Sequence, residues 1–149
     1  PSHKYNQIYT SEQAFFDDLE QMNSIIKAQT GNDASIIRFP GGSSNTVSKD
    51  YCPGIMTQLV NDVTARGLLY CDWNVSSGDA NSKPISTEQV VQNVISGVQS
   101  HNVSVVLQHD IKDFSVNAVE QIIQWGQANG YTFLPLTTSS PMSHHRVNN

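Results

Sequence analysis

Three polar residues of this 149-residue sequence come at or just after the ends of short aliphatic runs. Arg38, Asp72 and His109 hold equivalent places, each following one of three successive runs. In parallel α/β folds, groups that carry acid–base chemistry gather at the carboxyl ends of the strands. Each residue has a plainer alternative, as a salt-bridged rim arginine, a turn-capping aspartate or a hydrogen-bonded loop histidine. The presence of three such residues at equivalent positions favours a candidate active site on one rim of a sheet.

The elements that must position these residues alternate between helix and strand. Apolar periodicity predicts helices over about residues 11–31, 53–67, 86–98 and 115–130, and strands over 35–39, 68–71, 103–107 and 131–134. Repeated units of this kind predict an α/β fold with parallel strands and right-handed crossovers. We expect residues 1–149 to form a single domain, with residues 137–149 packing as a loop.

Local signals support the helix boundaries. Ser11 is a plausible N-cap, and Gly31 is a plausible end of the same helix. Ser86 and Gln89 fit a capping box, and Ser115 is expected to cap the last helix.

The composition excludes some classes of protein. The net charge is -5 and the sequence has no Lys/Arg cluster, so nucleic acid is not an expected partner. No apolar run approaches the roughly 18 residues that a membrane span requires. Cys52 and Cys71 form no CxxC pair, which argues against a zinc–thiolate site and leaves both a disulfide and two separate thiols open.

An ordered set of short motifs resembles one known family. Arg38-Phe39-Pro40-Gly41-Gly42, Asp72-Trp73, Leu107-Gln108-His109 and the opening Ser2-His3 resemble later motifs of the polysaccharide deacetylases. Members of this family are carbohydrate esterases that remove N- or O-acetyl groups. The resemblance spans nearly the whole chain, and the order of the motifs makes it more specific than any one of them.

The resemblance implies a distorted (β/α)7-type barrel that binds zinc or a similar divalent ion through one Asp and two His. His3 matches the second metal histidine, and His109 matches the acid that protonates the leaving group. Asp72 matches the carboxylate that orients His109, and Arg38 matches the residue that holds the catalytic base.

The same resemblance implies a set of substrate-binding residues. Leu107 and Trp73 match walls of the acetyl pocket, while the N–H of Gly41 is expected in an oxyanion hole. Phe39 and Pro40 belong to the same motif and are expected at the substrate.

Two departures from the family matter. Its opening Thr-Phe-Asp-Asp-like motif, which supplies the base and the metal aspartate, is absent. The pair Asp17-Asp18 follows His3 and falls in a helix, so we expect it to be solvated helix surface. The first metal histidine would precede Pro1. We therefore expect an incomplete barrel that lacks its N-terminal strands and, with His3 as its one metal ligand, is inactive as an isolated chain.

These observations predict a function for the complete protein. We expect metal-dependent hydrolysis of acetyl groups from an acetylated polysaccharide, with N-acetylglucosamine of peptidoglycan or chitin preferred and acetylxylan open. Such a protein is expected outside the cell or at the cell wall. The alternative is a degenerate deacetylase domain that binds a glycan or a partner without catalysis. Because open strand edges pair readily, we expect either a homodimer or association with the missing N-terminal half.

Overall fold

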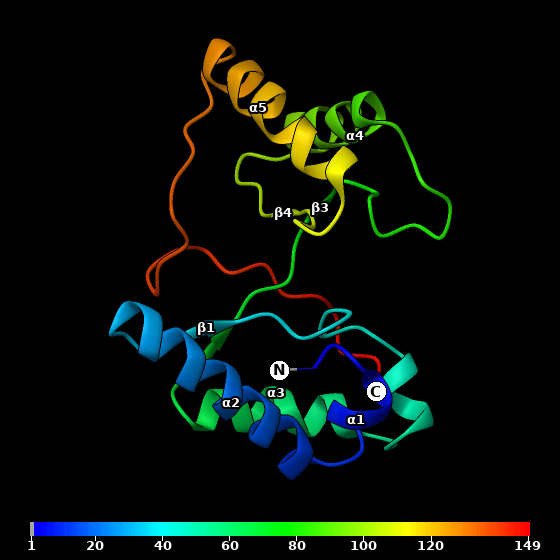
Figure 1. The fold of residues 1–149 in the computed structure, drawn as a ribbon, viewed down its shortest axis with the longest axis vertical. Coiled ribbons are helices and arrows are strands. Elements are labelled where there is room, and N and C mark those ends of the chain that lie inside the picture. Colours follow the sequence, from blue (N-terminus) through cyan, green and yellow to red (C-terminus); the bar gives the residue numbers. More distant parts are fainter. Residues whose placement is uncertain (1) are drawn as a thin grey trace. The chain divides into compact units, whose positions relative to one another are not determined.

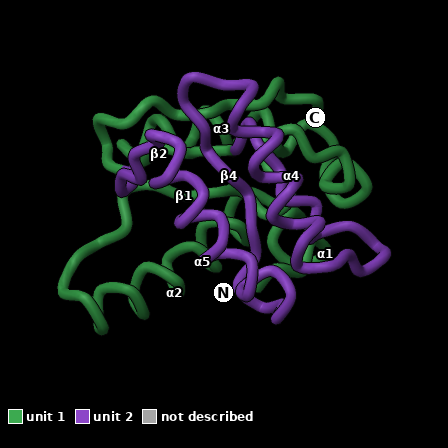
Figure 2. Tube along the Cα trace, turned by 90° about the horizontal axis from the view of Figure 1, so that it is seen from above, with its two compact units in different colours: residues 1–72, 137–149 green, residues 73–136 purple. Residues whose placement is uncertain are grey.

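The structure is a computed structural model that describes residues 2–149 and divides into two compact units (Figure 2). Unit 1 holds the chain up to Asp72 together with Thr137–Asn149, and unit 2 holds Trp73–Leu136. The prediction of a single domain over residues 1–149 stays a prediction. Each unit combines helices with one short parallel sheet, which confirms a mixed α/β fold.

Unit 1 is built from three α-helices, a 3-10 turn and two strands (Figure 1). In chain order these are α1 (Tyr5–Ile8), α2 (Glu12–Thr30), β1 (Ile36–Ile37), η1 (Val47–Asp50), α3 (Ile55–Ala65) and β2 (Leu69–Tyr70). The two strands run parallel, with Ile36 opposite Leu69 and Ile37 opposite Tyr70. The carboxyl ends of β1 and β2 therefore lie next to each other, which brings Arg38 close to Asp72.

The predicted boundaries of α2 are confirmed. The Ser11 hydroxyl accepts a hydrogen bond from the N–H of Ala14 at 3.1 Å, and Gly31 ends the helix with a φ of 77°. An L side chain would be strained at that angle. Phe15 and Phe16 on this helix are buried in the core of unit 1.

Unit 2 is smaller and also pairs helices with a parallel sheet. It contains β3 (Val75–Ser76), α4 (Thr87–Gln99), β4 (Val106–Leu107) and α5 (Asp113–Ala128). Val75 lies opposite Val106 and Ser76 opposite Leu107. Its core is made by the apolar faces of α4 and α5, namely Val90, Val91, Val94, Ala118 and Ile122.

Ser86 caps α4 as predicted, since its hydroxyl accepts from the N–H of Gln89 at 3.2 Å. The reciprocal bond of a capping box, in which the Gln89 side-chain oxygen would accept from the Ser86 N–H, is not among the hydrogen bonds of residues 2–149, and the Gln89 NH2 group donates to Asn93 at 2.8 Å. The prediction of Ser115 as a helix cap is wrong. Helix α5 begins at Asp113, and Ser115 lies in its first turn, where its hydroxyl donates to Asp79.

The predicted fourth strand over residues 131–134 is also wrong. This segment is irregular, and Phe133 and Leu134 expose 52% and 80% of their surface. A strand exists only where a neighbour completes its hydrogen-bond ladder, and no described segment pairs with this one. Conversely, β3 was not predicted, because two residues between polar neighbours carry too little pattern.

The C-terminal segment has no regular structure but is docked on unit 1. The N–H of Asp72 donates to the carbonyl of Ser143 at 2.7 Å. Asn149 accepts hydrogen bonds from the N–H groups of Gly54 and Thr57 at the start of α3. Cys52 and Cys71 are both free thiols. No helix within residues 2–149 is long and apolar enough to cross a membrane.

Candidate active site

His109 is held by a buried carboxylate in unit 2. Its Nδ1 lies 2.8 Å from Oδ1 of Asp79, and its backbone N–H donates to Oδ2 of the same residue at 2.7 Å. The Asp79 side chain is 1% exposed and that of His109 is 32% exposed. One ring edge of the imidazole is therefore fixed by the protein while the ring still reaches solvent.

The hydrogen bonds to Asp79 decide its charge. Burial opposes ionisation of this carboxyl, but bonds from the Ser115 hydroxyl, from His109 and from the Ser77 hydroxyl outweigh it and lower its pKa to about 2. Ser115 donates to Oδ2 at 2.6 Å. An ionised carboxylate has no proton to give, so Nδ1 of His109 is the donor in this pair. The Nε2 atom is then the one available for proton transfer.

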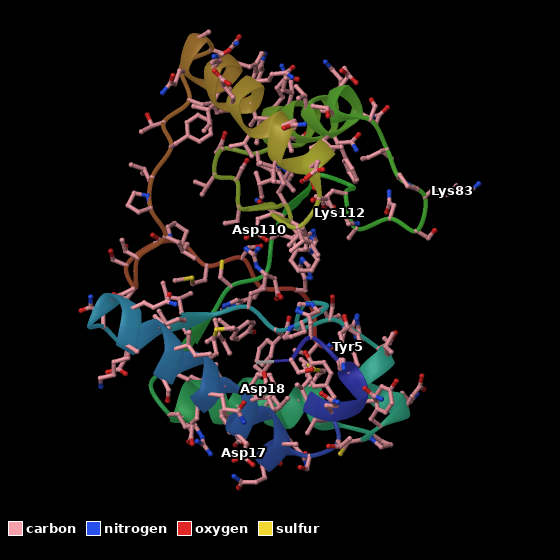
Figure 3. The ribbon with its side chains drawn as sticks, in the orientation of Figure 1. Tyr5, Asp17, Asp18, Lys83, Asp110 and Lys112 are labelled. Atoms are coloured by element: carbon pink, nitrogen blue, oxygen red, sulfur yellow. The ribbon has the colours of Figure 1, made fainter. Side chains whose placement is uncertain are left out.

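Lys112 and Gln108 support this arrangement from the loop that leads into α5. The Lys112 ammonium donates to the backbone carbonyl of Asp79, and Gln108 donates to the carbonyl of Ser115 at 2.6 Å. Figure 3 shows Asp110 and Lys112 at this end of unit 2. The loop after β4 is thus tied to the Asp79 loop on both sides of His109.

The residue that orients His109 is Asp79, which corrects the prediction of Asp72. Asp79 stands just beyond β3, and the parallel partner β4 leads to His109, so the two residues follow paired strands. Without recognition of β3, Gly78-Asp79 is indistinguishable from an ordinary turn.

Asp72 has other partners, all in unit 1. Its buried carboxylate accepts from the N–H of Ser43 at 2.8 Å, from the Ser43 hydroxyl at 2.5 Å and from the N–H of His145 at 2.9 Å. Arg38 lies beside it: its Nε donates to the carbonyl of Cys71 at 3.0 Å and its Nη2 to the carbonyl of Asp72 at 3.1 Å. The predicted proximity of Arg38 and Asp72 is therefore observed within this unit.

The turn after Arg38 is fixed by buried groups. The Tyr9 hydroxyl donates to the carbonyl of Pro40 at 2.7 Å, and burial, with the neighbouring Tyr5 phenol, raises the pKa of Tyr9 so that it stays a donor. Gly41 has a φ of 78°, and a Cβ there would lie 2.1 Å from the Tyr5 hydroxyl. Gly41 is thus required by both its backbone angle and its neighbour.

The Phe39 side chain anchors this turn in the hydrophobic core of unit 1. It is 1% exposed, and its ring centroid lies 5.5 Å from that of Phe15 and 5.3 Å from that of Tyr70. A side chain buried in the core cannot contact a glycan, so the prediction of Phe39 as a substrate-binding residue is wrong.

His3, Arg38 and Pro40 line one hollow of about 230 Å³ in unit 1. Its walls are largely apolar and come from α1, α2 and β1, and Asp18 also faces it. Asp18 accepts from the N–H of Ser2 at 2.5 Å and is half-buried, so it is not the solvated residue that was predicted, whereas Asp17 is exposed. Both aspartates project from α2 (Figure 3).

The described residues fit only part of a catalytic zinc site. His3 is exposed at the hollow and can supply one imidazole ligand. Catalytic zinc normally takes three protein ligands, and no group of three His, Cys, Asp or Glu suited to a metal occurs among residues 2–149. Within the described chain, His3 is therefore a single ligand and not a complete site.

Trp73 and Leu107 are the remaining residues that were predicted to bind the substrate. Trp73 is half-buried directly after Asp72, and Leu107 is half-buried in β4. Their contact with an acetyl group stays a prediction. The convergence of Arg38 and His109 on one rim also stays a prediction, because the two belong to different units.

Comparison with known proteins gives consistent matches. A peptidoglycan-N-acetylglucosamine deacetylase of Bacillus cereus is 27% identical over 136 residues, which are 89% of this chain and 46% of that protein. The chain thus spans about half the length of this curated relative. No protein-family model matches it.

Two solved structures agree with this match. The crystal structure of the catalytic domain of peptidoglycan N-acetylglucosamine deacetylase from Eubacterium rectale is 99% identical, with a TM-score of 0.98 over 99% of this chain and 67% of that one. A CE4 esterase of Streptococcus mutans is 25% identical, with a TM-score of 0.69 over 89% of this chain and 58% of that one.

Proposed function

Because this chain belongs to the polysaccharide deacetylase family, we propose that the complete catalytic domain hydrolyses the acetamide of N-acetylglucosamine units in peptidoglycan. Both named peptidoglycan deacetylases among its relatives support this substrate over acetylxylan. Peptidoglycan lies outside the cytoplasmic membrane, so the proposal places the enzyme outside the cell or at the cell wall.

The observation that carries the proposal is the pair formed by Asp79 and His109. The ionised Asp79 holds Nδ1 of His109 as a donor, so that in its imidazolium form the ring carries a second proton, on Nε2, that it can deliver. Hydrolysis of an acetamide needs such an acid, because the departing sugar amine must be protonated as the C–N bond breaks. We assign His109 as this acid and Asp79 as the residue that orients it.

Unit 1 carries further residues to which the family resemblance assigns roles in the reaction. Arg38 is fixed by the carbonyls of Cys71 and Asp72, and we assign it the task of holding the carboxylate base. The N–H of Gly41 is assigned to the oxyanion hole. Arg38 lines the same hollow as His3, which we propose as one ligand of a divalent ion, zinc first. When bound, that ion supplies Lewis-acid polarisation of the acetyl carbonyl and an activated water.

The base and the remaining metal ligands must come from chain outside the described residues. We propose that the N-terminal part of the domain supplies them and completes a distorted (β/α)7-type barrel. The apolar hollow beside His3 supports this in unit 1. In unit 2, Val116, Val119 and Ile123 project at helical spacing from α5 and are 47%, 42% and 37% exposed. Both surfaces are suited to be covered by further strands and helices.

Acetate release by the complete catalytic domain tests the proposal. N-acetylglucosamine oligomers and purified peptidoglycan are incubated with the domain in the presence of zinc, and then after chelation. The proposal predicts release at enzymatic rates that is lost on chelation and restored by metal. A domain that binds these glycans without releasing acetate would support the alternative of a non-catalytic glycan-binding protein.

A further inference from the structure

The carboxylate of Asp72 is fully buried. It does not hold His109, which is bonded to Asp79. The donors to the Asp72 carboxylate are the N–H and hydroxyl of Ser43 and the N–H of His145. A buried carboxylate costs folding free energy unless hydrogen bonds satisfy it. Three short bonds do so here, and they link segments about thirty and seventy residues away in the sequence.

The backbone of Asp72 takes part in the same network. Its carbonyl accepts from Arg38 and its N–H donates to Ser143. One residue thus joins the end of β2, the turn after β1 and the C-terminal segment. Within unit 1, Arg38, Ser43 and the C-terminal segment are thus all hydrogen-bonded to this one residue, through its backbone or its side chain.

The Ser43 bonds fix one end of a short turn. The N–H of Gly42 donates to the carbonyl of Phe39 at 2.7 Å, which closes the turn, and Tyr9 fixes it at Pro40. Gly41 lies between the Tyr9 anchor and the Asp72 anchor. A donor in an oxyanion hole works only when it is held in place before the reaction, and small displacements cost much of its effect.

We propose that Asp72 is a positioning residue for the deacetylation reaction. Its carboxylate accepts hydrogen bonds from the N–H and the hydroxyl of Ser43. These bonds hold the turn of residues 38–43, and with it the Gly41 N–H, in the position that the reaction requires. By accepting the N–H of His145, Asp72 makes that placement depend on the C-terminal segment. This inference rests on the proposed function, since it assigns Asp72 no contact with the substrate.

Substitution by asparagine tests the carboxylate with little change of shape. In Asp72→Asn one oxygen still accepts from Ser43, but an NH2 group replaces the oxygen that receives the Ser43 hydroxyl and the His145 N–H. The hydroxyl can turn to accept, whereas the His145 N–H cannot. We expect kcat to fall about tenfold or more with KM little changed, because the lost effect belongs to the transition state.

Ser48→Ala is the matched control for a second variant, Ser43→Ala. Both serines are fully buried in unit 1, and the hydroxyl of each bonds to the C-terminal segment, Ser48 through the Asn149 side chain at 2.9 Å. Of these two serines, only Ser43 donates to the Asp72 carboxylate. If Ser43→Ala and Ser48→Ala lost the same stability but only Ser43→Ala lost kcat, the effect on kcat would come from the position of the turn and not from weaker folding.

The experiment uses the complete catalytic domain and measures kcat, KM, the unfolding midpoint and the amide NMR signal of Gly41 in each variant. The proposal predicts a shifted Gly41 signal and reduced kcat for Asp72→Asn and Ser43→Ala, and neither change for Ser48→Ala. An unchanged Gly41 signal with wild-type kcat in Ser43→Ala would overturn it, even if Asp72→Asn does not fold. A wild-type domain that releases no acetate contradicts the proposed function instead, and the Gly41 signal alone then decides the positioning role.

Discussion

The Asp79→Asn substitution should weaken the fold in a pH-dependent way. The folded-state pKa of Asp79 is about 2 against an ordinary value of 3.8, so the unfolded chain binds a proton that the folded chain does not. Such a group stabilises the fold fully above the ordinary pKa, and the contribution disappears as the pH falls toward the lowered value. Because the side chain is 1% exposed, solvent screens this effect little.

The expected size follows from the shift. A lowering of nearly two pKa units corresponds to about 2 kcal/mol of unfolding free energy. Urea unfolding of the 149-residue chain should show wild type about 2 kcal/mol more stable than Asp79→Asn at about pH 6, with the difference shrinking as the pH falls from about 4 to about 2.

Asp110→Asn is the control for this experiment, because Asp110 is exposed in the loop that follows His109. It should leave the pH dependence of stability as in wild type. If Asp79→Asn and wild type lost stability in parallel over the acid range, the hydrogen bonds assigned to the Asp79 carboxylate would not favour its ionised form, and the assignment of the His109 Nδ1 proton would fail with them.

Further outcomes are expected. Tyr9→Phe should cost about 1 kcal/mol in urea unfolding, because the Pro40 carbonyl loses its donor; unchanged stability would mean that this bond contributes nothing. In the complete domain, His109→Ala should lower kcat far more than it changes KM in acetate-release assays, and near-normal turnover would remove His109 from the mechanism. The isolated 149-residue chain should release little or no acetate even with added zinc; enzymatic rates would contradict the account of its metal ligands. Light scattering should find this chain self-associated, and a stable monomer at micromolar concentration would argue against that.

Much of the fold could be predicted because its signals are local. The Ser11 and Ser86 caps and the glycine that ends α2 lie where the sequence placed them. Strand ends were predicted from aliphatic runs, and the parallel pairing of β1 with β2 then brings Arg38 to Asp72. Periodicity and capping are properties of a few neighbouring residues, so a sequence reveals them.

The errors come from contacts that no local pattern records. The segment 131–134 has the composition of a strand but no described neighbour to pair with, and Ser115 looks like a cap while its hydroxyl donates to Asp79. Asp79 itself was missed because β3 is only two residues long. The choice between Asp72 and Asp79 as partner of His109 depends on which parallel pair each follows, and that is settled by packing alone.

The role of the Asp79–His109 pair is tested by the rate of acetate release by the complete catalytic domain with Asp79→Asn, compared with wild type and with Asp72→Asn. An asparagine would turn an NH2 group or a weaker acceptor toward Nδ1 of His109, so that Nδ1 is no longer held as the donor and Nε2 is no longer the atom presented to the leaving group. We expect kcat to fall by about a hundredfold or more while KM stays within a few-fold. Wild-type turnover in Asp79→Asn, with the loss appearing only in Asp72→Asn, would contradict the assignment of Asp79 and His109 as the acid pair.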